Sequence, residues 1–304
     1  MKLWRWKRLE STAGSFAALC LAIVLCGMPA AGHAAGILYE KDSLFGRVTV
    51  KEDEAGFRTL HFGRDGARQS VVKPGDPEHL ELPYARVAMA GLALSGRVER
   101  VLIVGLGGGT LPSFLRRLYP GAQIDVVDID PEVINVAKRF FEFREDDRMR
   151  AHLADGRAFI EAVRHPYDII FLDAFGSDSV PERLTTVEFL RAVRAATLPG
   201  GVVVGNVWGP YSNRLYNSML RTYRETFDDF TVLDVKGAGN KILLALPRRQ
   251  GLDRRQLLER VRQLSAAQKF RFDLVELVEF GYEREPERTD TGTILRDRNL
   301  GRLE

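Results

Sequence analysis

Residues 101–110 read VLIVGLGGGT and place a short apolar run directly before a cluster of glycines. Three of the first four residues are β-branched, which is typical of a strand that is covered on both faces. Glycines at four of the next five positions allow a sharp turn and a close approach of the backbone to a ligand. We expect a helix from about Leu111, with its N-terminal N–H groups directed at the turn. A tight strand–helix turn without a ligand would have the same sequence, so the glycines alone leave both interpretations open.

Acidic residues follow the next predicted strands. Residues 124–130 read IDVVDID and predict a second buried strand that ends in carboxylates. Asp128 comes about two dozen residues after the turn, where a nucleotide-binding βαβ unit places the carboxylate for the ribose hydroxyls; a solvated acid beside a helix is the alternative. Residues 153–157 and 167–173 add Asp155 and Asp173 to the series. Because the carboxyl ends of parallel strands meet at one edge of a sheet, these motifs predict a single crevice.

With these motifs, the chain resembles the spermidine synthase (polyamine aminopropyltransferase) family. This family is a branch of the class I S-adenosylmethionine-dependent methyltransferase fold. The similarity extends from about Leu38 to Pro247 and includes Gln69 and Tyr84. The resemblance implies an α/β, Rossmann-like domain, with a mostly parallel sheet and helices on both faces, preceded by a small antiparallel β-domain. It also implies a homodimer, a small-molecule amine as substrate, and decarboxylated S-adenosylmethionine or S-adenosylmethionine as co-substrate.

The resemblance also implies the roles of individual residues. The nucleoside would be bound by the glycine turn and by two strand ends, namely Gly105, Gly107, Gly108, Gly109, Asp128, Asp155 and Gly156. Asp155 would accept from the adenine amino group, because a carboxylate is an acceptor. Asp173 would take the proton from the attacking amine, which is protonated near neutral pH and cannot attack until it loses that proton. Gln69, Tyr84 and Asp178 would face the substrate. Asp155 could instead belong to an Asp-Gly turn after its strand, and Asp173 could only cap the turn that follows it.

Three positions depart from the family pattern and leave the reaction open. Spermidine synthases have an aspartate at the position of Gly108, and this aspartate recognises the amine of the transferable aminopropyl group. They have a second aspartate at the position of Gly176. They also have an acidic residue after the tyrosine, where this chain reads Ala85-Arg86. Aminopropyl transfer to a diamine or polyamine is the first interpretation. Methyl transfer from S-adenosylmethionine is the second, because spermidine synthase-like methyltransferases have similar glycine turns. An exported protein that binds nucleosides or polyamines without catalysis is the third.

The first 34 residues have the pattern of an export signal. Four basic residues come before the apolar run 13–25, which is long enough for a signal-peptide core and short for a membrane span. Gly32 and Ala34 provide small residues for cleavage after Ala34. We therefore predict an exported, periplasmic protein. A segment that stays uncleaved would anchor the protein in the inner membrane, and translation from Met28 would leave it in the cytoplasm.

Cysteine usage and charge exclude several classes of protein. Cys20 and Cys26 both lie in the predicted signal, so the mature chain would have no thiol for a disulfide, a thiolate nucleophile or a cysteine metal site; no metal is expected. The chain has 44 basic and 41 acidic residues. Four of the basic residues and one acidic residue lie in the first 34 positions, so the chain after residue 34 has 40 basic and 40 acidic residues. This balance excludes a strongly basic nucleic-acid-binding protein.

The predicted organisation has four segments: a signal or anchor over 1–34, the β-domain over 35–95, the Rossmann-like catalytic domain over 96–247, and a C-terminal part over 248–304. In the last segment, residues 252–269 have the spacing of an amphipathic helix. From Phe280 onward the sequence is polar and charged, and we expect it to be poorly ordered.

Overall fold

The computed structural model of the chain describes residues 35–63, 66–176, 180–251, 253–283 and 291–301. The predicted export segment lies outside these residues, with both cysteines and Met28, so the predicted localisation stays a prediction. Asp178 also lies outside them. In the described part of the chain, we find no helix with the length and apolar character that a membrane crossing requires.

An antiparallel sheet of four strands forms the N-terminal part. Its strands lie in chain order: β1 (Gly36–Ser43), β2 (Gly46–Glu52), β3 (Arg58–Phe62) and β4 (Arg68–Val72). The last three were predicted, and the small β-domain is confirmed. The sequence gives little signal for β1 because this edge strand is largely exposed and has no alternating apolar residues. In contrast, Val48, Val50 and Leu60 are almost completely buried.

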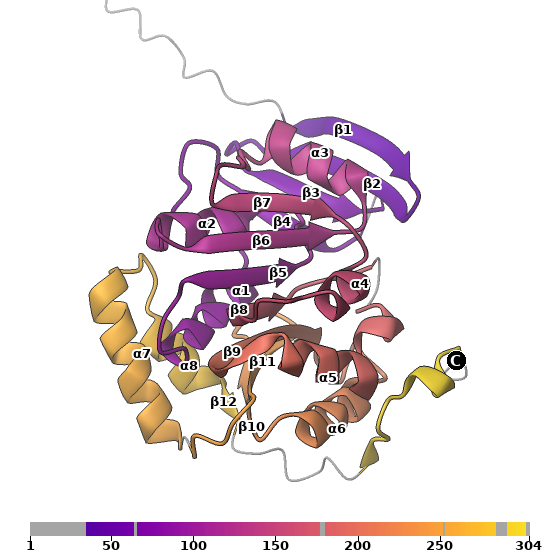
Figure 1. The fold of residues 1–304 in the computed structure, drawn as a ribbon. Helices are drawn as coiled ribbons and strands as arrows, with labels where there is room; N and C mark the ends of the chain where they lie inside the picture. Colours follow the sequence, from indigo (N-terminus) through magenta and orange to yellow (C-terminus); the bar gives the residue numbers. More distant parts are fainter. Residues whose placement is uncertain (1–34, 64–65, 177–179, 252, 284–290, 302–304) are drawn as a thin grey trace, which may run out of the picture. The chain divides into compact units, whose positions relative to one another are not determined.

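The second sheet has eight strands in the order β12-β10-β11-β9-β8-β5-β6-β7 (Figure 1). The pairs β5–β6, β6–β7, β5–β8 and β8–β9 are parallel, and the pairs that involve β10, β11 and β12 are antiparallel. The strands are β5 (Arg100–Val104), β6 (Gln123–Asp128), β7 (Met149–Leu153), β8 (Tyr167–Leu172), β9 (Thr197–Trp208), β10 (Asp229–Asp234), β11 (Asn240–Leu246) and β12 (Tyr282–Glu283). The order reverses at β5, which lies between β6 and β8 and creates a switch point at their carboxyl ends.

Helices cover both faces of this sheet, as the predicted fold requires. Val101 and Ile103 of β5 belong to one hydrophobic core, and Leu102 and Val104 belong to the other, because successive side chains of a strand point to opposite faces. The first core contains side chains of α1 (Pro83–Ala88), η1 (Met89–Ala93), α2 (Thr110–Leu118), α3 (Pro131–Phe140), α7 (Arg254–Gln268) and α8 (Leu274–Gly281). The second contains side chains of α4 (Gly156–Glu161), α5 (Val187–Ala195) and α6 (Tyr216–Thr226).

Helix α3 connects the two sheets. Figure 1 shows it lying across β1 and β2. The Tyr39 hydroxyl donates to the Glu132 carboxylate at 2.6 Å, and the Lys41 ammonium pairs with the same carboxylate. The Ser43 hydroxyl donates to Asp130, the N-cap residue of this helix. These contacts hold the β1–β2 hairpin beside the carboxyl end of β6.

The prediction of poor order from Phe280 onward is wrong for residues 280–283 and 291–301, and residues 284–290 and 302–304 lie outside the described residues. Phe280 lies in α8, and Tyr282 and Glu283, which follow the end of this helix, pair with β10 as β12. Residues 291–301 lie against α5 and α6, with Leu295 almost completely buried. Residues of α5 and α6 form hydrogen bonds with the backbone of Gly292, Thr293, Leu295 and Asp297. These bonds hold a polar segment in place, and a polar composition gives no signal for them. The predicted helix over 252–269 is present as α7, and the division into four segments stays a prediction.

Candidate active site

A cavity of about 550 Å³ lies between the two sheets, at the carboxyl ends of β5, β6 and β8. This volume is within the range of small-molecule pockets. Most of the predicted site residues line it: Gly105, Gly107, Asp128, Asp155, Gly156, Asp173, Gln69 and Tyr84. Gly108 and Gly109 do not line it, and Asp178 lies outside the described residues. The predicted crevice is therefore present, and it contains residues that come from far apart in the sequence.

The glycine turn brings β5 close to the end of β8. Gly105 has φ +100°, and a Cβ there would lie 2.3 Å from the Asp173 carbonyl oxygen, so no other residue fits. A Cβ at Gly108 would lie 2.5 Å from the Phe141 ring and 2.9 Å from Ser70 Cβ. The space beside Gly108 is thus filled by the protein itself. Its N–H donates to the Ser70 hydroxyl at 2.9 Å, which ties the turn to β4.

Asp128 connects the glycine turn to the end of β6. Its two carboxylate oxygens accept from the N–H groups of Leu106, at 2.8 Å, and Asp130, at 2.9 Å. Burial raises the pKa of Asp128, while these N–H groups act in the opposite direction. The Gly107 N–H acts on the same carboxylate, and a carboxylate has about four acceptor positions, so one position remains for a hydroxyl donor. The carboxylate can therefore hold the turn and bind a ribose at the same time.

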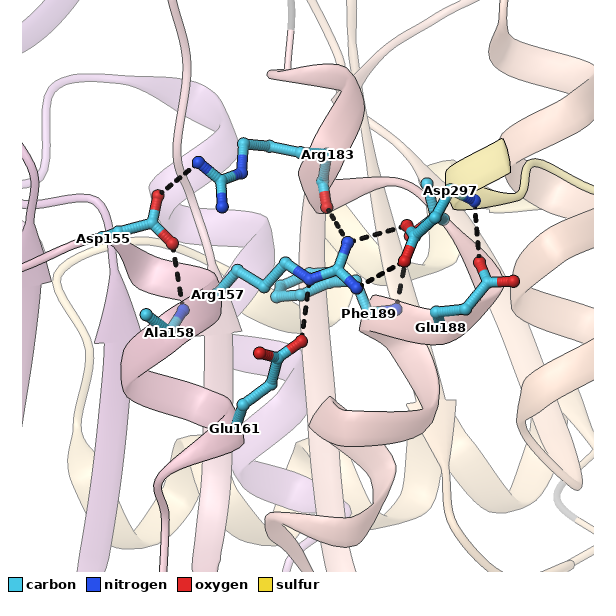
Figure 2. Close-up of polar contacts among 9 residues, drawn as sticks. Asp155, Arg157, Ala158, Glu161, Arg183, Glu188, Phe189 and Asp297 are labelled. Atoms are coloured by element: carbon cyan, nitrogen blue, oxygen red, sulfur yellow. Dashed lines mark hydrogen bonds and ion pairs between the residues drawn. The ribbon is translucent and has the colours of Figure 1, made fainter. Parts of the chain in front are cut away.

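Asp155 has two partners within the protein (Figure 2). One oxygen accepts from the Ala158 N–H at 2.9 Å and caps α4, which is the structural role considered as the alternative. The other lies 3.1 Å from a guanidinium nitrogen of Arg183. Arg183 comes from η2 (Glu182–Leu184) and also lines the cavity. The sequence alone gave no indication that this arginine would pair with Asp155.

Asp173 lies at the carboxyl end of β8 between two neutral donors. Asn206 Nδ2 donates to one oxygen at 2.8 Å, and the Tyr84 hydroxyl donates to the other at 3.1 Å. Asn240 Nδ2 in turn donates to Asn206 Oδ1 at 2.9 Å, which fixes the amide orientation. Burial raises the pKa of Asp173 to about 6, although both donors act in the opposite direction. A carboxylate with this pKa is ionised at neutral pH and is basic enough to accept a proton.

Asn206 and Asn240 are site residues that sequence reasoning missed. Asn206 is a buried polar residue in the apolar strand β9, and this contrast was the available signal. Gln69 is the extra residue of a β-bulge in β4, because Leu60 pairs with Ser70 and His61 pairs with Arg68. A bulge changes the direction of a side chain, and Gln69 lines the cavity here. Within the described ranges, no group of three or more His, Cys, Asp or Glu residues could hold a metal ion.

Fold and cavity define the class of the protein: a Rossmann-like α/β protein of the class I methyltransferase type, with a nucleoside-sized cavity at the switch point. The spermine/spermidine synthase domain model matches residues 85–233. The polyamine aminopropyltransferase of Vibrio vulnificus is 36% identical over 227 aligned residues, in a match that covers 71% of this chain and 75% of the relative. The chain therefore belongs to the spermine/spermidine synthase family, and it is an enzyme of the transferase type.

Two solved structures show the same fold. A spermidine synthase in complex with the transition state analogue AdoDATO has a TM-score of 0.60 and 21% identity, and the match covers 78% of this chain and 80% of that one. Human methyltransferase-like protein 13 in complex with SAH has a TM-score of 0.58 and 27% identity, with 69% and 99% covered. The predicted family and fold class are confirmed.

Proposed function

We propose that the protein transfers an aminopropyl group from decarboxylated S-adenosylmethionine to a small amine, as in polyamine biosynthesis. The observation that carries this proposal is the Asp173 carboxylate in the cavity, held by Tyr84 and Asn206 and with its pKa raised to about 6. Family membership supports it, because the relative from Vibrio vulnificus is a polyamine aminopropyltransferase. The predicted homodimer and the predicted export stay predictions.

Three carboxylates have separate roles in this proposal. Asp128 binds the ribose hydroxyls, and Asp155 accepts from the adenine amino group. Asp173 first accepts a proton from the ammonium group of the substrate. The neutral amine nitrogen then attacks the propyl carbon next to the sulfonium, the carbon–sulfur bond breaks, and its electron pair stays on the sulfur of methylthioadenosine. Holding both substrates in line supplies most of the remaining acceleration.

A methyltransferase that uses S-adenosylmethionine is the second candidate. Spermidine synthases have an aspartate at the position of Gly108, and here Phe141 and Ser70 occupy the space that such a side chain would need. The structural neighbour with bound SAH, methyltransferase-like protein 13, supports the same candidate. Methyl transfer would leave S-adenosylhomocysteine, and Asp173 would again accept the proton of an amine acceptor.

One experiment tests both candidates. The purified full chain is incubated with putrescine and either donor, and the nucleoside products are separated by chromatography. We expect methylthioadenosine from the decarboxylated donor and a large loss of this product in Asp173→Asn. Glu279→Gln is the matched control, because it removes a charge from an exposed ion pair with Arg254 at 3.1 Å. S-adenosylhomocysteine from the other donor would establish methyl transfer. Nucleoside binding without either product would favour a binding protein.

A further inference from the structure

The C-terminal segment 291–301 is fixed to α5 and α6 by hydrogen bonds. The Val187 N–H donates to the Leu295 carbonyl at 2.8 Å, and the Leu295 N–H donates to the Thr222 hydroxyl at 3.0 Å. Arg221 donates to the Gly292 carbonyl at 2.7 Å. The segment therefore has a defined position on α5 and α6, and we refer to residues 291–301 as the C-terminal strap.

Asp297 is the residue of the strap that binds Arg157. Its two carboxylate oxygens accept from the two terminal nitrogens of Arg157 at 2.7 and 2.6 Å (Figure 2). The Thr186 hydroxyl, at the N-cap of α5, donates to the same carboxylate at 2.7 Å. The Arg157 side chain is 16% exposed and the Asp297 side chain is 37% exposed, so the guanidinium side of this two-bond pair is shielded from solvent.

Arg157 continues this network to the cavity wall. It follows Gly156 in the first turn of α4, and its third nitrogen donates to Glu161 at 2.8 Å. A terminal nitrogen also reaches the Arg183 carbonyl at 3.4 Å. The Arg183 side chain pairs with Asp155, and both of these residues line the cavity. Figure 2 shows the resulting path from the strap through Arg157 to Asp155.

We propose that Asp297 is a positioning residue of the nucleoside site. By holding the Arg157 guanidinium, it fixes the first turn of α4 and the backbone of η2, so that Asp155 and Arg183 face the adenine base together. The inference rests on the proposed function for the identity of the ligand. It assigns a role to the strap that is separate from the chemistry at Asp173, because neither Asn206 nor Tyr84 contacts the network of Figure 2 among the described contacts.

Binding of methylthioadenosine, measured by calorimetry, tests this inference without requiring turnover. We expect Asp297→Asn to weaken binding roughly tenfold, because it removes a charge-assisted, two-bond contact that organises the site. Arg157→Lys should weaken binding similarly, because lysine cannot form two parallel hydrogen bonds to one carboxylate. The control Glu279→Gln should leave binding unchanged. In turnover assays, the KM for the donor should rise while the KM for the amine and the pH midpoint of the rate stay the same.

If Asp297 had only a structural role, the binding and unfolding measurements would give a different result. The melting temperature would fall, but the folded fraction would bind methylthioadenosine with the affinity of the unchanged protein. An unchanged dissociation constant in either folded variant would overturn the inference. Binding by the unchanged protein without aminopropyl transfer would overturn the proposed function alone. A complete absence of binding would overturn both.

Discussion

Replacing Asp173 by asparagine should greatly reduce activity and stabilise the fold. Burial raises the pKa of this carboxyl from 3.8 to about 6 in the folded protein. A group whose folded pKa is raised favours the neutral form, so its ionisation costs stability above that pKa, and a difference of this size corresponds to roughly 3 kcal/mol. Because the carboxyl faces an open cavity, water reduces the cost, and we expect Asp173→Asn to gain about 1–3 kcal/mol above pH 7.

The asparagine side chain is well matched to its surroundings. Its carbonyl can accept from Asn206, and its NH2 group can donate to the Tyr84 hydroxyl oxygen. Urea unfolding of both proteins at about pH 8 and about pH 4 measures the effect, because the stability gain should largely disappear near the unfolded pKa. The rate of methylthioadenosine formation should fall by about 10²–10⁴-fold. Equal stability of the two proteins at both pH values, or a variant of full activity, would refute the reasoning.

Three further predictions follow from the same geometry. The value of kcat/KM should rise with pH to a plateau, with a midpoint of about 6, because Asp173 must be ionised to accept a proton; a profile that is flat from about pH 5 to 8 would contradict this assignment of the base. Tyr84→Phe should move that midpoint upward, because it removes a donor that stabilises the carboxylate; initial rates across the pH range measure the shift, and a downward shift would exclude this cause. Gly108→Ala should destabilise the fold by about 1–3 kcal/mol through overpacking, whereas Gly121→Ala, which meets no atom within 4 Å, should have little effect in thermal unfolding.

The local parts of the site could be predicted because each has its own signal in the sequence. An apolar run followed by glycines, or by an acid, indicates the carboxyl end of a buried strand. Asp128, Asp155 and Asp173 follow this rule, and parallel pairing then brings them to one edge. The signal for each residue lies within a few positions of it, so long-range pairing was not needed to identify it.

The partners of these acids could not be predicted in the same way. Asn206 is 33 positions after Asp173 and reaches it because β8 and β9 are neighbours in the sheet. Arg183 reaches Asp155 from a separate short helix. The strand order and the path of the loops determine which polar residues meet these acids. Amino-acid composition predicts neither of them. The C-terminal strap shows the same limit, since a single buried leucine, Leu295, and its backbone hydrogen bonds fix a segment that is otherwise polar.

The charge of the cavity bears on the choice between the two donors. The charged residues among its described lining are Arg68, Asp128, Asp130, Asp155, Asp173 and Arg183. With all carboxylates ionised, this set has a net charge of −2. The decarboxylated donor has a sulfonium and an ammonium, whereas S-adenosylmethionine also has a carboxylate, which this field would repel. The summed charge can therefore attract the dication even though Gly108 provides no acid of its own. On this argument the field of the whole cavity, rather than one aspartate in the glycine turn, favours aminopropyl transfer.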